Sequence, residues 1–189
     1  EVNVQHYRLI LCLPELYMLA MIGILLIQSL VRNESDGGAK SVNWVPVAAF
    51  IGIIISGLCL VHDGTMFWGE HAVEAGETFW GAYRVDSLSQ FFKLAVFIGF
   101  FITSLNGLKP PALGQGKRPD YFLFLGFSAW GLMLLASAVE LITIYVALEI
   151  SSYSLYALIP LRSNDKRAAE AGIKYIMFGA VATAIALYG

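Results

Sequence analysis

Charged residues are scarce in this chain of 189 residues. Lysine, arginine, aspartate and glutamate make up 14% of it, whereas 58% is hydrophobic. Soluble globular domains carry roughly 25% charged residues, so the composition predicts an integral membrane protein in contact with a lipid bilayer. The formal net charge of −2 comes without any lysine- or arginine-rich cluster, which argues against a nucleic-acid partner.

Cysteine is almost absent too. Cys12 and Cys59 lie in apolar runs without a CxxC pattern or a histidine-rich neighbourhood, so we interpret both as reduced, buried thiols and expect no metal site. The chain also lacks GxGxxG, GxxxxGK[ST], HExxH and GxSxG patterns. We therefore expect no bound cofactor and no redox centre in this chain. If this chain transports ions, the energy has to come from a reaction outside it.

Long apolar runs fill most of the sequence and predict a single all-α membrane domain. A helix of about 20 residues crosses the hydrocarbon core at ~1.5 Å per residue. We predict six spans, at about residues 9–31, 42–61, 83–105, 120–138, 141–161 and 168–189. The loops after the first, third and fifth spans hold eight of the twelve basic residues, and the loops after the second and fourth hold none. The positive-inside rule places the basic loops in the cytoplasm and the N-terminus on the opposite side.

Three charges lie deep inside the predicted spans. Glu149 lies about 12 Å from the nearer end of the fifth span, Lys174 about 9 Å inside the sixth and Lys93 about 15 Å inside the third. A charge at such depth costs roughly 2.5–3.5 kcal/mol on insertion scales, so each needs a partner or a wet cavity. An acid and a base on consecutive helices are typical of a proton or ion path.

Polar residues accompany Glu149 along one face of its helix, at Tyr145, Ser152, Tyr153 and Tyr156. Lipid offers such a stripe no hydrogen bonds, so the stripe must face protein or water. Glu149 can therefore be a proton carrier, with Tyr145 and Tyr153 as candidate members of the path. Alternatively, it is a neutral acid that only holds helices together.

The two lysines also allow more than one interpretation. Desolvation disfavours the ammonium of Lys174 and a nearby carboxylate favours it, so the balance can keep the group ready to release a proton. Alternatively, its long side chain reaches back to the basic loop. Lys93 is either part of a path or one half of a structural ion pair. Glu15 is expected at the membrane interface, and Asp86 is expected to be an interfacial or helix-capping acid.

Two motifs point to a known family. ALEISSYSLY contains Glu149 and EAGIKYIMFGA contains Lys174, and LPELYML and YRVDSLSQFFKLAV extend the match. With these motifs the chain strongly resembles subunit N of the bacterial proton-pumping NADH-quinone oxidoreductases, the complex I counterpart of mitochondrial ND2. The resemblance implies an antiporter-like fold with inverted repeats of five helices, of which these residues would be the first part. It also matches Glu149 and Lys174 to the proton path of that family.

The resemblance carries further expectations. It implies a subunit of the bacterial inner membrane, with a periplasmic N-terminus, beside other membrane subunits of complex I. NADH, FMN, iron–sulfur clusters and quinone are expected in those partner subunits, and redox chemistry there would drive charge shifts near Glu149. Two alternatives stay open. One is a subunit of a cation/proton antiporter or membrane-bound hydrogenase, and the other is a membrane scaffold whose buried charges only hold helices together.

Overall fold

The computed structural model describes residues 12–31, 42–67, 76–78, 82–108, 117–161 and 166–188. Within these ranges six helices and one short β-hairpin follow one another. They are α2 (Leu13–Val31), α3 (Val45–Phe67), β1 (Gly76–Thr78), β2 (Tyr83–Val85), α4 (Ser87–Gly107), α5 (Arg118–Ser137), α6 (Leu141–Leu161) and α7 (Lys166–Tyr188). The helical membrane fold predicted from the apolar runs is confirmed, and the hairpin is an addition to it.

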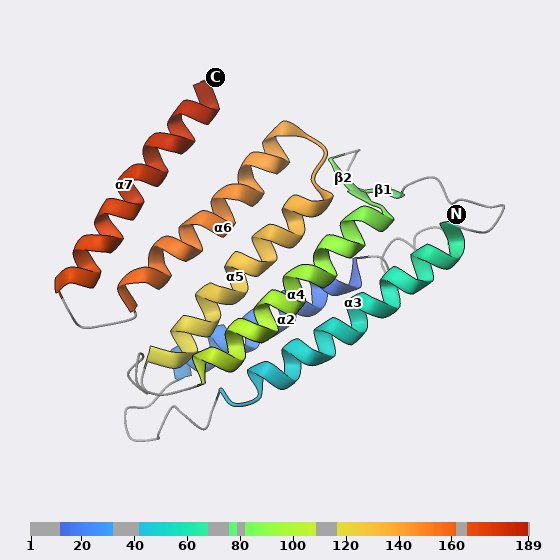
Figure 1. Ribbon diagram of the computed structural model, residues 1–189, viewed down its shortest axis with the longest axis horizontal. Helices are drawn as coiled ribbons and strands as arrows, with labels where there is room; N and C mark the ends of the chain where they lie inside the picture. Colours follow the sequence, from blue (N-terminus) through green and yellow to red (C-terminus); the bar gives the residue numbers. More distant parts are fainter. Residues whose placement is uncertain are drawn as a thin grey trace.

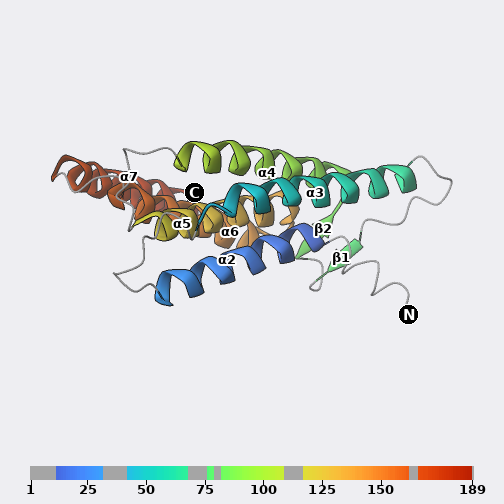
Figure 2. The same cartoon turned by 90° about the horizontal axis from the view of Figure 1, so that it is seen from below.

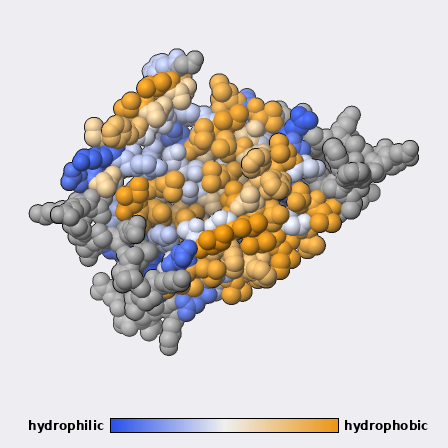
Figure 3. All heavy atoms as spheres, in the orientation of Figure 1, coloured by the Kyte–Doolittle hydropathy of each residue, from blue (hydrophilic) through white to orange (hydrophobic). Residues whose placement is uncertain are grey.

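Five of these helices, α2, α4, α5, α6 and α7, are long and apolar enough to cross a membrane. The sixth, α3, has a shorter apolar part, Val45–Val61, and continues to Phe67. Figure 3 shows one face of the molecule as a broad band of apolar side chains, with hydrophilic residues gathered mainly toward its ends. A hydrocarbon layer would cover such a band, so the chain is a multi-pass membrane protein.

The start of α4 differs from the predicted start of the third span. Tyr83–Val85 form β2, and α4 begins only at Ser87 because Asp86 is extended, with φ −136° and ψ 171°. Asp86 Oδ1 accepts a hydrogen bond from Ser89 N at 2.7 Å, and Asp86 N donates to Ser89 Oγ at 3.0 Å. This capping box satisfies backbone donors that a helix end leaves without partners. The interpretation of Asp86 as a helix-capping acid is confirmed.

The helix α5 lies at the centre of the bundle. It packs against α2, α4 and α6, and Figure 2 shows α2 on one side of it and α4 on the other. The helix α3 packs against α4 and α2, while α7 lies at the edge against α6 (Figure 1). The hydrophobic core gathers side chains from the first four helices of this set, including Met18, Ala49, Phe97 and Phe122. The pair α6–α7 therefore extends outward from a bundle packed around α5.

Small residues let α5 and α6 approach closely. A Cβ atom at Gly131 would lie 2.7 Å from Ser151 N and 3.0 Å from Ala147 O, closer than a side chain tolerates. One turn away, the hydroxyls of Ser128 and Ser151 share a hydrogen bond at 3.2 Å. Small residues at such crossings are typical of helices packed in membranes. This contact fixes α6, which carries Glu149, against the central helix.

The hairpin lies at the end of the bundle where α4 begins and α5 ends, and we call this the hairpin end (Figure 1). The strands β1 and β2 pair in antiparallel fashion. Tyr83 also forms a bridge to Ala138, and Val139 N donates to Ala82 O at 3.1 Å. The segment 82–85 is therefore joined both to the start of α4 and to the turn between α5 and α6.

Candidate functional site

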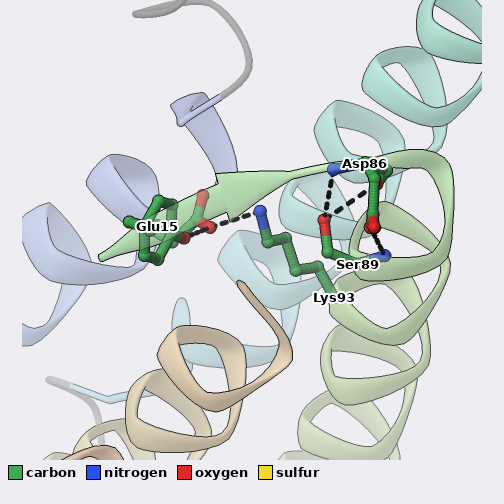
Figure 4. A network of polar contacts seen from close by, with 5 residues as sticks. Glu15, Asp86, Ser89 and Lys93 are labelled. Atoms are coloured by element: carbon green, nitrogen blue, oxygen red, sulfur yellow. Dashed lines mark hydrogen bonds and ion pairs between the residues drawn. The ribbon is translucent and has the colours of Figure 1, made fainter. Parts of the chain in front are cut away.

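A buried acid–base cluster lies at the hairpin end. Lys93 extends from α4 toward Glu15 in the first turn of α2, and Lys93 Nζ lies 2.5 Å from Glu15 Oε1 (Figure 4). The two side chains are 0% and 7% exposed, respectively. The hydroxyl of Tyr83 on β2 donates a hydrogen bond to the same carboxylate oxygen, and Lys93 Nζ lies 5.6 Å from the centre of the Tyr83 ring. Side chains from α2, β2 and α4 thus meet at one carboxylate, and α2 is distant in sequence from the other two elements.

The electrostatics of this cluster favour a neutral tyrosine beside an ion pair. A buried charge is strongly disfavoured unless an opposite charge and further hydrogen bonds offset its desolvation. Burial raises the pKa of Tyr83 well above its ordinary value, and the Glu15 carboxylate raises it further. Tyr83 therefore remains a proton donor to Glu15. Cys12, in the turn before α2, interacts electrostatically with both members of the pair.

The sequence does not show what surrounds Glu15. Glu15 lies in the first turn of α2 and is buried, at 6% exposure. The physical reason is local, because β2 and α4 cover the first turn of α2 and supply Tyr83 and Lys93 as partners. For Lys93, the ion-pair interpretation is confirmed by this contact.

Glu149 lies in the third turn of α6, and its side chain is half-buried. Tyr153, one turn further along, donates a hydrogen bond to its carboxylate and is itself exposed. Tyr145, one turn earlier, is half-buried, as are Ser152 and Tyr156. The polar stripe of α6 thus lies on a face that this chain covers only in part.

Lys174 lies in the third turn of α7 and pairs with a residue of its own helix. Its Nζ lies 2.6 Å from Glu170 Oε1, at a spacing of four residues, and the two side chains are 65% and 64% exposed. In the described part of the chain, Glu149 interacts with Tyr153 and Lys174 pairs with Glu170, and no ion pair joins Glu149 to Lys174. The structure therefore places the two predicted path residues on neighbouring helices without direct contact.

Tyrosine rings fill the contact between these two helices. The ring centres of Tyr153 and Tyr156 on α6 lie 5.7 Å apart, and those of Tyr156 and Tyr175 lie 5.2 Å apart, both in edge-to-face geometry. The Tyr156 hydroxyl reaches the backbone of Gly179, where a Cβ atom would lie 1.8 Å from it. The three rings thus run from Tyr153, which interacts with Glu149, to Tyr175, which follows Lys174 in sequence.

Comparisons with known proteins agree with these features. A family model described as "NADH:quinone oxidoreductase/Mrp antiporter, TM" matches residues 138–189. NADH-quinone oxidoreductase subunit N 2 of Solidesulfovibrio magneticus is 49% identical over 179 residues, which cover 94% of this chain and 34% of that protein. The chain belongs to the subunit N family of NADH-quinone oxidoreductases. The resemblance inferred from the motifs is thereby confirmed.

Other members of the subunit N family match at similar coverage. NADH-quinone oxidoreductase subunit N of Alkalilimnicola ehrlichii is 35% identical over 182 residues, 95% of this chain and 34% of that protein. A chain of respiratory complex I from Thermus thermophilus with bound aureothin aligns with a TM-score of 0.62 and 28% identity, over 93% of this chain and 35% of that one. The chain spans about a third of the length of the curated relatives it matches.

Two acids of this subunit N chain are missed by reasoning from the sequence alone. A signal exists for Glu15, since a lysine as deep as Lys93 requires a carboxylate and LPEL places one in another apolar run. Glu170 lies four residues before Lys174, a spacing that brings helical side chains together. Among the described residues, no group of three His, Cys, Asp or Glu could hold a metal ion.

Proposed function

We propose that this chain is a proton-translocating part of the membrane subunit N of a bacterial NADH:quinone oxidoreductase, and that Glu149 and Lys174 carry the protons. One observation supports this proposal above the others. The family match at residues 138–189 falls on α6 and α7, the two helices that hold these charges. In this role the chain contributes to a translocase, and the oxidation of NADH takes place in other subunits.

The proposed transfer depends on the carboxylates around each carrier. Glu149 is half-buried and accepts a hydrogen bond from Tyr153, while the ammonium of Lys174 is held by Glu170. Moving a negative charge away from a lysine weakens its hold on the proton, and moving it closer strengthens that hold. Redox chemistry in partner subunits would shift the charge near Glu149, and a lysine would then release its proton along the path.

The tyrosines between α6 and α7 supply polar groups along this route. A phenolic hydroxyl both donates and accepts hydrogen bonds, so it can connect two carriers that do not touch. Tyr153 already contacts Glu149, and Tyr156 lies between it and Tyr175. Tyr145 is the remaining candidate, one turn before Glu149. We assign these residues to the path as a hypothesis.

The same proposal includes the membrane in which the chain lies and its orientation there. We infer that it lies in the bacterial inner membrane with a periplasmic N-terminus, because the basic loops of the sequence alternate with loops that lack basic residues. Its partners would be lipid and other membrane subunits of the complex, with no nucleic acid. NADH, FMN, iron–sulfur clusters and quinone would be bound by those partner subunits.

The test uses inverted membrane vesicles that contain the complete complex. Glu149→Gln and Lys174→Met are compared with wild type and with Glu140→Gln, a matched control at the exposed turn before α6. NADH-driven quinone reduction and the proton gradient are followed together, and subunit content is checked by blotting. We expect normal assembly and a lost gradient in the two path variants, with no change in the control. Wild-type gradients in both path variants would contradict the proposal, and loss of assembly in both would favour the scaffold alternative.

A second candidate function is a cation/proton antiporter subunit, since the matched family description also names the Mrp antiporter. A membrane-bound hydrogenase subunit is a variant of the same alternative. In both cases NADH oxidation would not be the driving reaction. Replacing sodium with choline in the vesicles separates these functions. An NADH-driven gradient that survives the replacement supports the oxidoreductase. Proton movement that requires sodium and does not respond to NADH supports the antiporter, and a gradient driven by hydrogen turnover rather than by NADH supports the hydrogenase.

A further inference from the structure

The cluster at the hairpin end is a buried titratable site that the proposed path does not use. Glu15 and Lys93 join α2 to α4, whereas Glu149 and Lys174 lie on α6 and α7. Neither α6 nor α7 contributes to the hydrophobic core beside this cluster, as far as the described side chains go. The cluster is therefore a separate chemical site within the same membrane domain.

One oxygen of the Glu15 carboxylate is unusual. Both Tyr83 and Lys93 approach Oε1 of Glu15. The second oxygen, Oε2, is buried and accepts no hydrogen bond from any residue that the structure describes. A buried carboxylate oxygen without a partner is costly, and in proteins internal water commonly satisfies such atoms. Oε2 is thus the atom at which a water molecule or a proton would bind.

We propose that Glu15, Lys93 and Tyr83 form a second proton-binding site, in which internal water reaches Oε2 of Glu15 and exchanges protons with the hairpin end of the bundle. The route to the surface is short. Glu15 lies in the first turn of α2, and Cys12, just before this helix, is partly exposed. This site is independent of the proposed path through α6 and α7.

The proton balance of the site is simple. A proton delivered by water forms an O–H bond at Oε2, the Glu15 carboxylate becomes neutral, and Lys93 keeps its three protons. The pair then carries one net positive charge, which the Tyr83 ring beside Lys93 Nζ stabilises through a cation–π contact at 5.6 Å. Release reverses these steps, and no other bond changes. The ring contacts the ammonium in both states, so it stabilises the charge of Lys93 whether Glu15 is charged or neutral.

Each element around the site contributes polar or titratable groups. The turn before α2 supplies Cys12, and β2 supplies Tyr83, which also interacts with the hydroxyl of Ser137 at the end of α5. The helix α4 supplies Lys93 itself and Asp86, whose carboxylate is engaged in the helix cap. The helix α3 carries Cys59 in its hairpin-side half.

Infrared spectroscopy tests this proposal without turnover. The complete complex is reconstituted in nanodiscs, and pH-difference spectra are recorded in H₂O and D₂O for wild type, Glu15→Gln and the matched exposed control Glu170→Gln. We expect wild type to show a protonated carboxyl component that grows as pH falls and shifts in D₂O. This component should be missing from the Glu15→Gln spectra and present in those of Glu170→Gln. Identical wild-type and Glu15→Gln spectra across the range where the complex stays assembled would overturn the proposal.

A second variant keeps the test decisive if Glu15→Gln fails to assemble. Tyr83→Phe retains the ion pair and the ring but removes the hydrogen bond that stabilises the charged carboxylate. The carboxyl band should therefore appear at a pH about one to two units higher than in wild type. An unchanged midpoint would contradict a proton-binding role for the site. Because neither readout needs NADH, the result is distinct from success or failure of the path through Glu149 and Lys174.

Discussion

Two glutamate–lysine pairs of almost equal length lie in different regions of this molecule. Glu15 and Lys93 approach to 2.5 Å between α2 and α4, and Glu170 and Lys174 approach to 2.6 Å on α7 alone. The first pair is nearly inaccessible to solvent and the second is about two-thirds exposed. The two ion pairs therefore have similar geometry, and their surroundings decide how much each contributes to stability.

Distance alone is therefore a poor guide to the energy of an ion pair. In the buried region neither partner can be removed without leaving an unpaired charge in an apolar interior, so the two helices are held together. The pair on α7 lies at the surface of the described bundle, so removing one partner leaves no unpaired charge inside this bundle and should cost it little. An exposed lysine is also free to meet residues of a partner subunit, which suits the role proposed for Lys174.

The largest effect that would test this comparison is expected for Lys93→Met. This change leaves the Glu15 carboxylate buried without its counter-ion, which should destabilise the subunit by about 3–5 kcal/mol. We expect the subunit to leave the complex at a clearly lower temperature, measured by heating followed by native electrophoresis and blotting. Lys174→Met is the matched control and should leave that temperature nearly unchanged.

A double variant separates the charge from the shape of Lys93. Glu15→Gln combined with Lys93→Met removes both charges and so avoids the unpaired carboxylate. Its stability should recover by at least half of the loss seen in Lys93→Met. If the double variant were as unstable as the single one, the packing of Lys93 rather than its charge would dominate the buried region.

An intermediate effect is expected for glycines in the two regions. Gly131→Ala places a Cβ atom 2.7 Å from the backbone nitrogen of Ser151, which cannot move without shifting α6. This overpacking should cost about 1–3 kcal/mol. Gly179→Ala on α7 meets the outer end of the Tyr156 side chain, its hydroxyl and the ring carbons Cζ and Cε1, which can rotate away without moving a backbone. In the same heating assay, the subunit with Gly131→Ala should leave the complex at a clearly lower temperature than the subunit with Gly179→Ala. An equal fall in this temperature would contradict the contrast between the packed α5–α6 contact and the open edge at α7.

The sequence predicts the helices of this fold well because the bilayer imposes a strong constraint. Backbone groups in lipid must find partners within the segment, so long apolar runs become helices. The start of α4 is less accessible to this reasoning, since Tyr83–Val85 look like helix by hydropathy and only the cap at Asp86 moves the start to Ser87. Local polar chemistry therefore overrides the hydropathy pattern at this end.

The candidate sites divide in the same way. The pair Glu170–Lys174 follows from spacing on one helix, a local rule that a sequence can display. The pair Glu15–Lys93 depends on how α2 and α4 meet in space, and no spacing along the chain reveals it. Sequence reasoning recognises that Lys93 needs a partner, but the partner's identity is fixed by packing.

The smallest effect on stability is expected for Glu170→Gln. An exposed pair four residues apart on a helix contributes only about 0.3–0.5 kcal/mol, and salt screens it. The thermal loss of the subunit should therefore be indistinguishable from wild type at moderate salt. Proton pumping is a separate readout, because the variant removes the charge that holds the Lys174 ammonium. If the exposed pair serves transport, pumping in vesicles should change while assembly does not, which is the reverse of the pattern expected for Lys93→Met. An equal fall in pumping and in assembly would show that the pair on α7 contributes to stability as the buried pair does.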